Sequence, residues 1–174
     1  MTNERRQAEI RTFLLPLTLD DSNNNVFCLF SQNQVVEILG RRPVQRIPMS
    51  PNYLKGVLPY QDQLLPVINL DALCSRKSTA GQEGYRQLVV IRTGVVDSAT
   101  GEPLKAAITA SARVRIAKLS AQALATAFVE QEAPASLKNS GVLRGFFQQQ
   151  ANFIALIDLN QVLLGTSRDP GQVA

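Results

Sequence analysis

The side chains that most often carry out chemistry in enzymes are missing or scattered in this chain. Its 174 residues include no histidine, which excludes histidine-based general acid–base catalysis, a Ser-His-Asp triad and a phosphorylatable histidine. Serine and lysine occur without a nucleophile motif, and the acidic residues form no close constellation along the sequence. Segments 81–84 and 141–145 lack the glycine spacing of a phosphate-binding loop or a dinucleotide fingerprint. We therefore expect a protein that is not an enzyme.

The chain has two cysteines, Cys28 and Cys74, and without histidine they make a poor zinc site. The chain begins without a signal-peptide pattern, and its apolar runs are too short to span a bilayer. We therefore expect a cytoplasmic protein in which both cysteines are small buried hydrophobes rather than a disulfide. We expect no cofactor and no metal.

Two basic segments, 40–46 and 112–118, could bind an anionic partner. Their basic residues are Arg41, Arg42, Arg46, Arg113, Arg115 and Lys118. Alternation turns Arg113 and Arg115 to one side of a strand and Val114 and Ile116 to the other, so this strand should be half solvated and half buried. The net charge of +4 permits nucleic acid or an acidic protein surface as a partner. Aromatic residues that could stack on bases make up only 6% of the chain. A small β-barrel that binds nucleic acid through Arg41, Arg42, Arg46, Arg113 and Arg115 remains the alternative function.

A hairpin is predicted over residues 56–70, where two apolar runs of strand length flank the polar residues Gln61, Asp62 and Gln63. This polar stretch is either a plain turn or a recognition tip. Proline at positions 59 and 66 removes ladder donors, so both should lie at edges or bulges.

Short segments rich in Val, Ile, Leu and Phe recur along the whole chain and are separated by turn residues. These segments are 12–19, 26–30, 34–39, 56–60, 64–70, 87–92, 104–111, 114–119, 142–147 and 153–159. Their number and length predict a mainly β protein of the barrel or sandwich type. We expect one longer helix, over 121–131 with Ser120 as its N-cap, and single helical turns capped by Asp71 and Asn160.

Residues 56–73 and 141–163 resemble each other in sequence, and we call this similarity the internal echo. Each begins Gly-Val-Leu, continues through a turn and an apolar strand, and ends in VINLDAL or LIDLNQVL. Each copy reads as a hairpin closed by a helical turn. The echo favours two related subdomains packed together, although two apolar hairpins can also look alike by chance.

Residues 35–70 resemble the CheW-like adaptor domain of bacterial chemotaxis, on the order and spacing of three motifs. The matching residues are Val35, Glu37 and Ile38, then Pro51, Tyr53, Leu54, Gly56 and Val57, then Pro66, Val67, Ile68 and Leu70. Asn69 stands where the family usually has aspartate. The later strands follow in family order, so the resemblance covers roughly residues 12–165.

The resemblance implies two intertwined five-stranded SH3-like β-barrel subdomains with a few short helices. It implies a single domain over 12–165, divided near 75–87 with strand exchange, and flexible tails over 1–11 and 166–174. The function implied is that of a scaffold that couples the cytoplasmic tip of methyl-accepting chemoreceptors to the regulatory domain of a CheA-type histidine kinase. This role belongs to two-component signalling in flagellar or pilus motility, and it needs no catalysis, no nucleic acid and no direct membrane insertion. The protein would join membrane receptor arrays through its partners.

The chain departs from the family at the hairpin tip. Where the family has Asn-Leu-Arg-Gly, this chain has Pro59-Tyr60-Gln61-Asp62, so a neutral amide replaces a charged guanidinium and an aspartate replaces glycine. The partner surface should therefore differ. The predicted partner-binding residues are Val35, Glu37, Gly56, Val57, Leu58, Gln61 and Asp62, with core packing as the competing role of the valines and Leu58 and a backbone requirement as that of Gly56.

Overall fold

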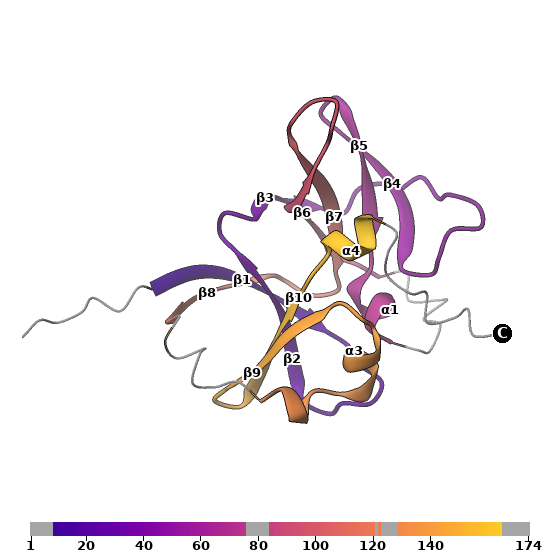
Figure 1. Ribbon diagram of the computed structural model, residues 1–174. Coiled ribbons are helices and arrows are strands. Elements are labelled where there is room, and N and C mark those ends of the chain that lie inside the picture. Colours follow the sequence, from indigo (N-terminus) through magenta and orange to yellow (C-terminus); the bar gives the residue numbers. More distant parts are fainter. Residues whose placement is uncertain (1–8, 76–83, 121, 123–128, 165–174) are drawn as a thin grey trace, which may run out of the picture.

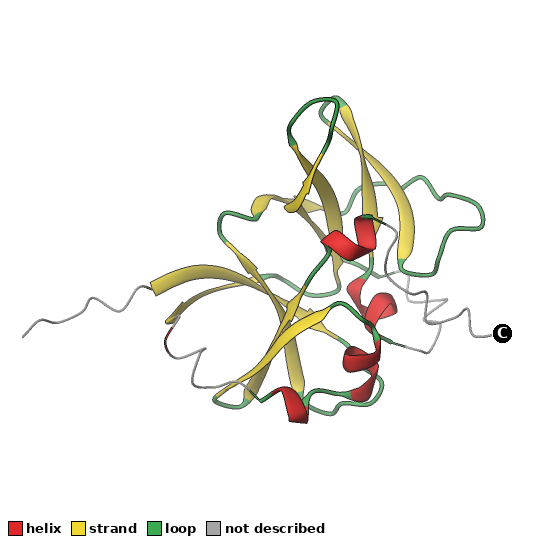
Figure 2. Ribbon diagram, in the orientation of Figure 1, coloured by secondary structure: helices red, strands yellow, loops and turns green. Residues whose placement is uncertain are grey.

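The computed structural model describes residues 9–75, 84–120, 122 and 129–164. Over these ranges the protein is mainly β, with two five-stranded sheets and a few short helices (Figures 1 and 2). The first sheet contains β1 (Glu9–Leu17), β2 (Asn25–Ser31), β8 (Arg115–Ser120), β9 (Leu143–Gln149) and β10 (Asn152–Ile157). The second contains β3 (Val35–Gly40), β4 (Leu54–Tyr60), β5 (Gln63–Ile68), β6 (Gln87–Val96) and β7 (Pro103–Ala110). The helices are α1 (Leu70–Cys74), η1 (Glu130–Glu132), α3 (Ala135–Asn139) and α4 (Asn160–Leu163).

The two sheets have the same topology. The strand orders are β8-β1-β2-β10-β9 and β3-β6-β7-β5-β4. In each sheet the second and third strands are antiparallel, the third and fourth are parallel, and the last two form an antiparallel hairpin at the edge. The predicted fold class is therefore confirmed.

The chain passes from the first sheet to the second between β2 and β3 and returns between β7 and β8. The predicted division near 75–87 instead falls between α1 and β6, and the strands on both sides of it, β5 and β6, belong to the second sheet. Residues 9–11, placed in a flexible tail by the sequence, form the start of β1. Residues 166–174 lie outside the described ranges.

The second sheet closes on itself into a barrel. Its edge strands are β3 and β4. Tyr60 on β4 donates a hydrogen bond from Oη to Glu37 Oε2 on β3 at 2.7 Å. The segment between these strands also pairs with β4, since the Gln45 and Val57 backbones exchange N–H···O bonds of 2.9 and 2.8 Å. The barrel encloses a small core of Leu39, Leu58, Tyr60, Leu65, Val67, Leu88, Val90 and Ala107.

A larger core lies between the two sheets and joins them. It takes Leu15, Cys28 and Phe30 from the first sheet and Ile68 and Ile108 from the second. Cys28 and Cys74 are free and buried in it, as predicted. Burial raises the pKa of the Cys28 thiol, and with the nearby Asp71 carboxyl it raises the pKa of Cys74 to about 12. Both cysteines therefore act as hydrophobic side chains.

The internal echo corresponds to the two edge hairpins and the helices that follow them, although the sequence aligned their first halves wrongly. The two-residue turns of the hairpins follow Tyr60 and Gln149. Counting from these turns makes Gly145, not Gly141, the equivalent of Gly56. The ends VINLDAL and LIDLNQVL align as expected, on β5–α1 and β10–α4.

The predicted helix caps are wrong for both short helices. Asn69 is the N-cap of α1, and its Oδ1 accepts from Ala72 N at 3.1 Å. Asn160 is the first residue of α4, where Asp158 Oδ1 accepts from the Asn160 N–H at 2.9 Å. Both predictions are wrong because the N-cap lies earlier than expected, two residues before Asp71 in α1 and one residue before Asn160 in α4. The helix predicted over 121–131 lies mostly outside the described residues.

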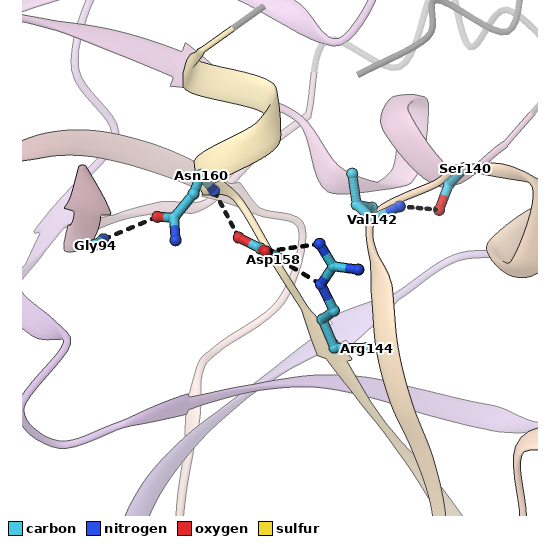
Figure 3. Close-up of polar contacts among 6 residues, drawn as sticks. All are labelled: Gly94, Ser140, Val142, Arg144, Asp158 and Asn160. Atoms are coloured by element: carbon cyan, nitrogen blue, oxygen red, sulfur yellow. Dashed lines mark hydrogen bonds and ion pairs between the residues drawn. The ribbon is translucent and has the colours of Figure 1, made fainter. Parts of the chain in front are cut away.

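Each helix instead uses its predicted cap residue to hold the other sheet. Asp71 Oδ1 on α1 accepts from the backbone N–H of Thr18, directly after β1, at 2.8 Å. Asn160 Oδ1 on α4 accepts from Gly94 N on β6 at 2.8 Å (Figure 3). These two reciprocal contacts fix the sheets relative to each other.

Two further expectations concern strand exposure. Pro59 lies on the edge strand β4, as predicted. Pro66 lies on the interior strand β5 and not at a bulge, so the prediction is wrong there; it is tolerated because pairing with β7 begins only at Val67. The half-buried pattern predicted for segment 112–118 is wrong at Ile116, which is 66% exposed. The reason is that the buried side of β8 is the opposite one, which carries Leu119 at 2% exposure.

Candidate functional site

The tip of the β4–β5 hairpin is a two-residue turn formed by Gln61 and Asp62, and both side chains are exposed. Gln61 takes the left-handed conformation with φ of +52°. The sequence placed the conformational conflict at Asp62, because glycine occupies that position in the family; the structure places the positive φ one residue earlier.

Three other predicted site residues serve the closed barrel. Glu37 accepts the bond from Tyr60 that joins the barrel edges. This bond, followed by burial and the negative charge of Glu37, raises the pKa of Tyr60, so the phenol stays a donor over the physiological range. Leu58 is only 3% exposed and belongs to the barrel core. Gly56 has φ of +139°, and a Cβ there would lie 2.0 Å from the Gln45 carbonyl oxygen. Gly56 is therefore required by the backbone conformation at this position.

The remaining predicted residues are Val35 and Val57, and both are half-buried. Val35 lies on β3 and packs against the larger core. Val57 lies on the outer face of the hairpin, directly opposite Pro66. The structure thus gathers Gln61, Asp62 and Val57 on one hairpin but gives Glu37, Gly56 and Leu58 structural roles.

An uncovered apolar surface, which we call the docking face, lies on the outside of the β4–β5 hairpin. It consists of Val57, Pro59, Leu64 and Pro66, which form the directly opposed pairs Val57–Pro66 and Pro59–Leu64. Alternation along β5 puts Leu64 on the same face as Ile68, which is buried in the larger core. Leu64 itself is 66% exposed, so the first sheet covers only part of this face.

The sequence analysis missed Pro59, Leu64 and Pro66 as site residues. They lie within runs that look like core, and only the packing of the two sheets leaves Pro59 and Leu64 exposed and Pro66 half-buried. Alternation along each strand separates them correctly from Leu58 and Leu65, so the face could have been found from the pattern. The sequence does not show that the first sheet leaves part of this face uncovered.

A small cleft of about 220 Å³ lies where the two sheets meet, lined by residues such as Phe30, Ile91 and Thr93. The Asn160–Gly94 contact closes one side of it. Asp158, also in its lining, accepts from Arg144 Nε and Nη2 through one oxygen at 3.1 and 3.0 Å (Figure 3). Every polar group named here has a partner within the protein, which is typical of a structural junction. Within the described ranges, no three His, Cys, Asp or Glu side chains gather where a metal ion could bind.

The two basic segments do not form one surface. Arg41, Arg42 and Arg46 lie in the connection between β3 and β4, and Arg115 lies on β8, its guanidinium carbon 5.0 Å from the centroid of the Phe27 ring. Figure 1 shows β8 and the β3–β4 connection on opposite sides of the molecule. These arginines therefore do not form a continuous basic stripe that could follow a nucleic-acid backbone.

Two five-stranded sheets of one topology, the second closed into a barrel with an apolar hairpin face on its outside, define the fold of this domain. The model of the CheW-like domain matches residues 19–167, and the chain belongs to this family. The fold is similar to that of the scaffolding protein TtCheW from Thermoanaerobacter tengcongensis, with a TM-score of 0.62 and 13% identity over 91% of this chain and 90% of that one. No curated protein sequence matches the chain. Among the described residues, no helix has the length and apolar character needed to cross a bilayer.

Proposed function

We propose that this protein is a chemotaxis adaptor that couples chemoreceptors to a CheA-type histidine kinase by binding alone, without catalysis. The match to the CheW-like family over residues 19–167 supports the adaptor role. The kinase regulatory domain and the cytoplasmic tip of the receptor are its partners. It acts in the cytoplasm and reaches membrane receptor arrays through these partners.

The observation that carries this proposal is the docking face. This face is an apolar surface on rigid paired strands, formed by Val57, Pro59, Leu64 and Pro66. Leu64 is exposed to an extent that folding does not require. A rigid apolar face gains affinity because little conformational entropy is lost when it is covered. Gln61 and Asp62 border this face with neutral and acidic hydrogen-bonding groups, so they select the partner rather than supply most of the affinity.

Calorimetric titration with the regulatory domain of a CheA-type kinase from the same genome tests the proposal. Leu64→Asp places a charge in the docking face and is expected to weaken binding by at least tenfold, about 1.4 kcal/mol. Ile116→Asp is the matched control, because Ile116 is also a strand residue and is equally exposed at 66%. Both variants should stay folded, since neither side chain contributes to a core.

Two results would count against the proposal. Equal loss of affinity in both variants would show a general effect of added negative charge, not a docking face. Absence of binding by the folded wild-type protein, to the kinase domain and to the receptor tip alike, would show that the chain has left this pathway.

A further inference from the structure

A hairpin arm, formed by residues 92–105 at the end of β6 and the start of β7, extends beyond the second sheet. The pairing of β6 with β3 ends at Ile91, and β7 pairs with β5 only at Ala107 and Ile108. Among the described strands, neither side of the arm therefore pairs with a third strand. Figure 1 shows the arm at the top of the view, next to the β4–β5 hairpin. A two-stranded hairpin alone is only marginally stable in water, so other contacts have to hold the arm in place.

Two hydrogen bonds fix the base of the arm. Arg92 N donates to the Gln34 carbonyl oxygen at 2.7 Å, and Gly94 N donates to Asn160 Oδ1 at 2.8 Å (Figure 3). A Cβ on Gly94 would lie 2.9 Å from Asn160 Nδ2, so glycine allows the amide side chain to come this close. The arm is thereby tied to α4, the helix that follows β10 of the first sheet.

The next bond carries this anchor across the arm to Leu104. The register between the two strands of the arm shifts between Arg92 and Val96, so regular pairing is interrupted there. Thr93 Oγ1 bridges the interruption by donating to the Leu104 carbonyl oxygen at 2.9 Å. Leu104 is therefore held by the neighbour of the residue that Asn160 anchors.

Leu104 lies on the same face of the sheet as Leu64 of the docking face. Strands β5 and β7 are parallel, with Ile68 opposite Ile108. Leu64 and Leu104 each lie four residues earlier on their strands, so the two lie level and point to the same side as these isoleucines. Leu64 is 66% exposed and Leu104 is 37% exposed, whereas both isoleucines are buried in the larger core. The apolar face thus continues from the docking face across β5 onto β7.

The covered part of this face shows what kind of surface fits the uncovered part. At Ile68 and Ile108 the face packs against the first sheet across the larger core. At Leu64 and Leu104 the same face continues on the same strands without this cover. A partner that covers three neighbouring strands has to offer a broad apolar surface, as the first sheet does. The surface of a folded domain meets this requirement.

We propose that Leu104 on the arm binds the kinase regulatory domain together with the docking face, and that Asn160 is a positioning residue that holds the arm for this contact. This inference rests on the proposed function and commits the whole surface to one partner. Leu104 contacts the kinase domain directly. Asn160 acts through Gly94 and the arm, so the helix after the first sheet sets the shape of a binding surface on the second.

Calorimetric titration of the kinase regulatory domain with the full chain tests the contact. Leu104→Asp places a charge on the surface and is expected to weaken binding at least tenfold. Ile10→Asp is the matched control, because Ile10 is also a strand residue, is 40% exposed and lies on β1 of the other sheet. It should leave the affinity unchanged. Both variants should stay folded, since neither side chain belongs to a core.

A second set of variants tests the positioning role. Asn160→Ala removes the acceptor for Gly94 N and should weaken kinase binding roughly three- to tenfold, whereas Asn160→Asp keeps an acceptor oxygen and should retain the affinity. In a chain that already carries Leu104→Asp, Asn160→Ala should weaken binding no further, because its effect passes through the arm. Amide hydrogen exchange should become faster over residues 92–105 in Asn160→Ala and stay unchanged in β2.

Four results would overturn the inference. Unchanged kinase affinity in Leu104→Asp, while Leu64→Asp still weakens binding, would do so and leave the proposed function standing. Equal losses in Leu104→Asp and Ile10→Asp would trace the effect to added negative charge. An equal loss from Asn160→Ala with and without Leu104→Asp would make Asn160 a general structural residue. If the folded wild type does not bind the kinase domain, the inference fails, and titration with the receptor tip then decides whether the proposed function fails as well.

Discussion

The hairpins β4–β5 and β9–β10 occupy equivalent places in their sheets, yet they differ in which of their residues are buried. Both turn through two residues, and both turns begin with a glutamine in the left-handed conformation, Gln61 at +52° and Gln150 at +55°. The positive φ at Gln61 is therefore a property of this hairpin type and does not by itself mark a functional tip. The difference between the copies lies in what covers their faces.

Three of the four positions of the docking face are buried in the second hairpin, and the fourth, Pro59, corresponds to the exposed Gln148. Counting from the turns, Leu64 corresponds to Phe153, and Val57 corresponds to Phe146. Leu64 is 66% exposed, whereas Phe153 is 8% and Phe146 1% exposed. The two phenylalanine rings stack with centroids 5.3 Å apart inside the larger core. One copy uses this face to hold the molecule together, and the other leaves Leu64 and Pro59 exposed.

The largest effect is expected from truncating the buried copy of this face. Phe153→Ala should lower the free energy of unfolding by about 3–5 kcal/mol, because it leaves a cavity in the core. Leu64→Ala, at the equivalent position, should change it by less than about 0.5 kcal/mol. Urea denaturation of both variants measures the difference. A similar loss of unfolding free energy in Leu64→Ala would mean that this face is packed in both hairpins, and the difference between them would not hold.

The equivalent glycines Gly56 and Gly145 give the next largest contrast. A Cβ on Gly56 would meet the Gln45 carbonyl oxygen at 2.0 Å and needs a φ of +139°. A Cβ on Gly145 would meet the end of the Phe147 ring at 2.9 Å, and this side chain can move. Gly56→Ala should therefore cost about 3 kcal/mol, since a strained backbone and an overlap each cost roughly 1–3 kcal/mol.

Gly145→Ala should cost less than about 1 kcal/mol, because only a side chain has to shift. Thermal and urea unfolding of the two variants provide the check. Equal costs would show that the β3–β4 connection yields to a methyl group and is not held rigidly against β4.

The strands and the repeated segments VINLDAL and LIDLNQVL were predicted from the sequence, because both depend on local apolar alternation and residue order. It misaligned Gly141 with Gly56, because Gly-Val-Leu recurs by chance a few residues before the true equivalent. It could not tell Leu64 from a core leucine, because exposure there depends on where the other sheet ends. The sequence analysis therefore named this hairpin, but it did not name three of the four residues of its apolar face.

At the hairpin tips, the expected effect is on partner binding and not on stability. Gln61→Arg adds a charged five-donor group beside the docking face and should change the affinity for the kinase domain or the receptor tip by about tenfold, near 1.4 kcal/mol. Gln150→Arg, at the equivalent tip, should change neither affinity. Both should unfold within about 0.5 kcal/mol of the wild type. Unchanged affinities in Gln61→Arg would show that the tip is only a turn.

The smallest expected effect on stability concerns the two hydrogen bonds by which a short helix holds the other sheet. Asp71 and Asn160 accept these bonds from equivalent positions. Burial raises the pKa of Asp71, and the bond from Thr18 N only partly opposes this. A carboxyl whose pKa is higher in the folded state than in the unfolded chain makes stability fall as pH rises from the unfolded pKa through the folded pKa. Asp71→Asn keeps the acceptor for Thr18 and removes this titration.

Asp71→Asn should therefore alter the free energy of unfolding by less than about 1 kcal/mol, with a change that is more favourable at pH 7 than at pH 3. Asn160→Asp should show the opposite trend, because it introduces a carboxylate beside Asp158, whose Oδ1 already accepts from the Asn160 N–H. Urea denaturation at the two pH values measures both. A difference between Asp71→Asn and the wild type that is the same at both pH values would show that Asp71 carries no penalty for its charge, and the two hydrogen bonds would then be electrostatically alike.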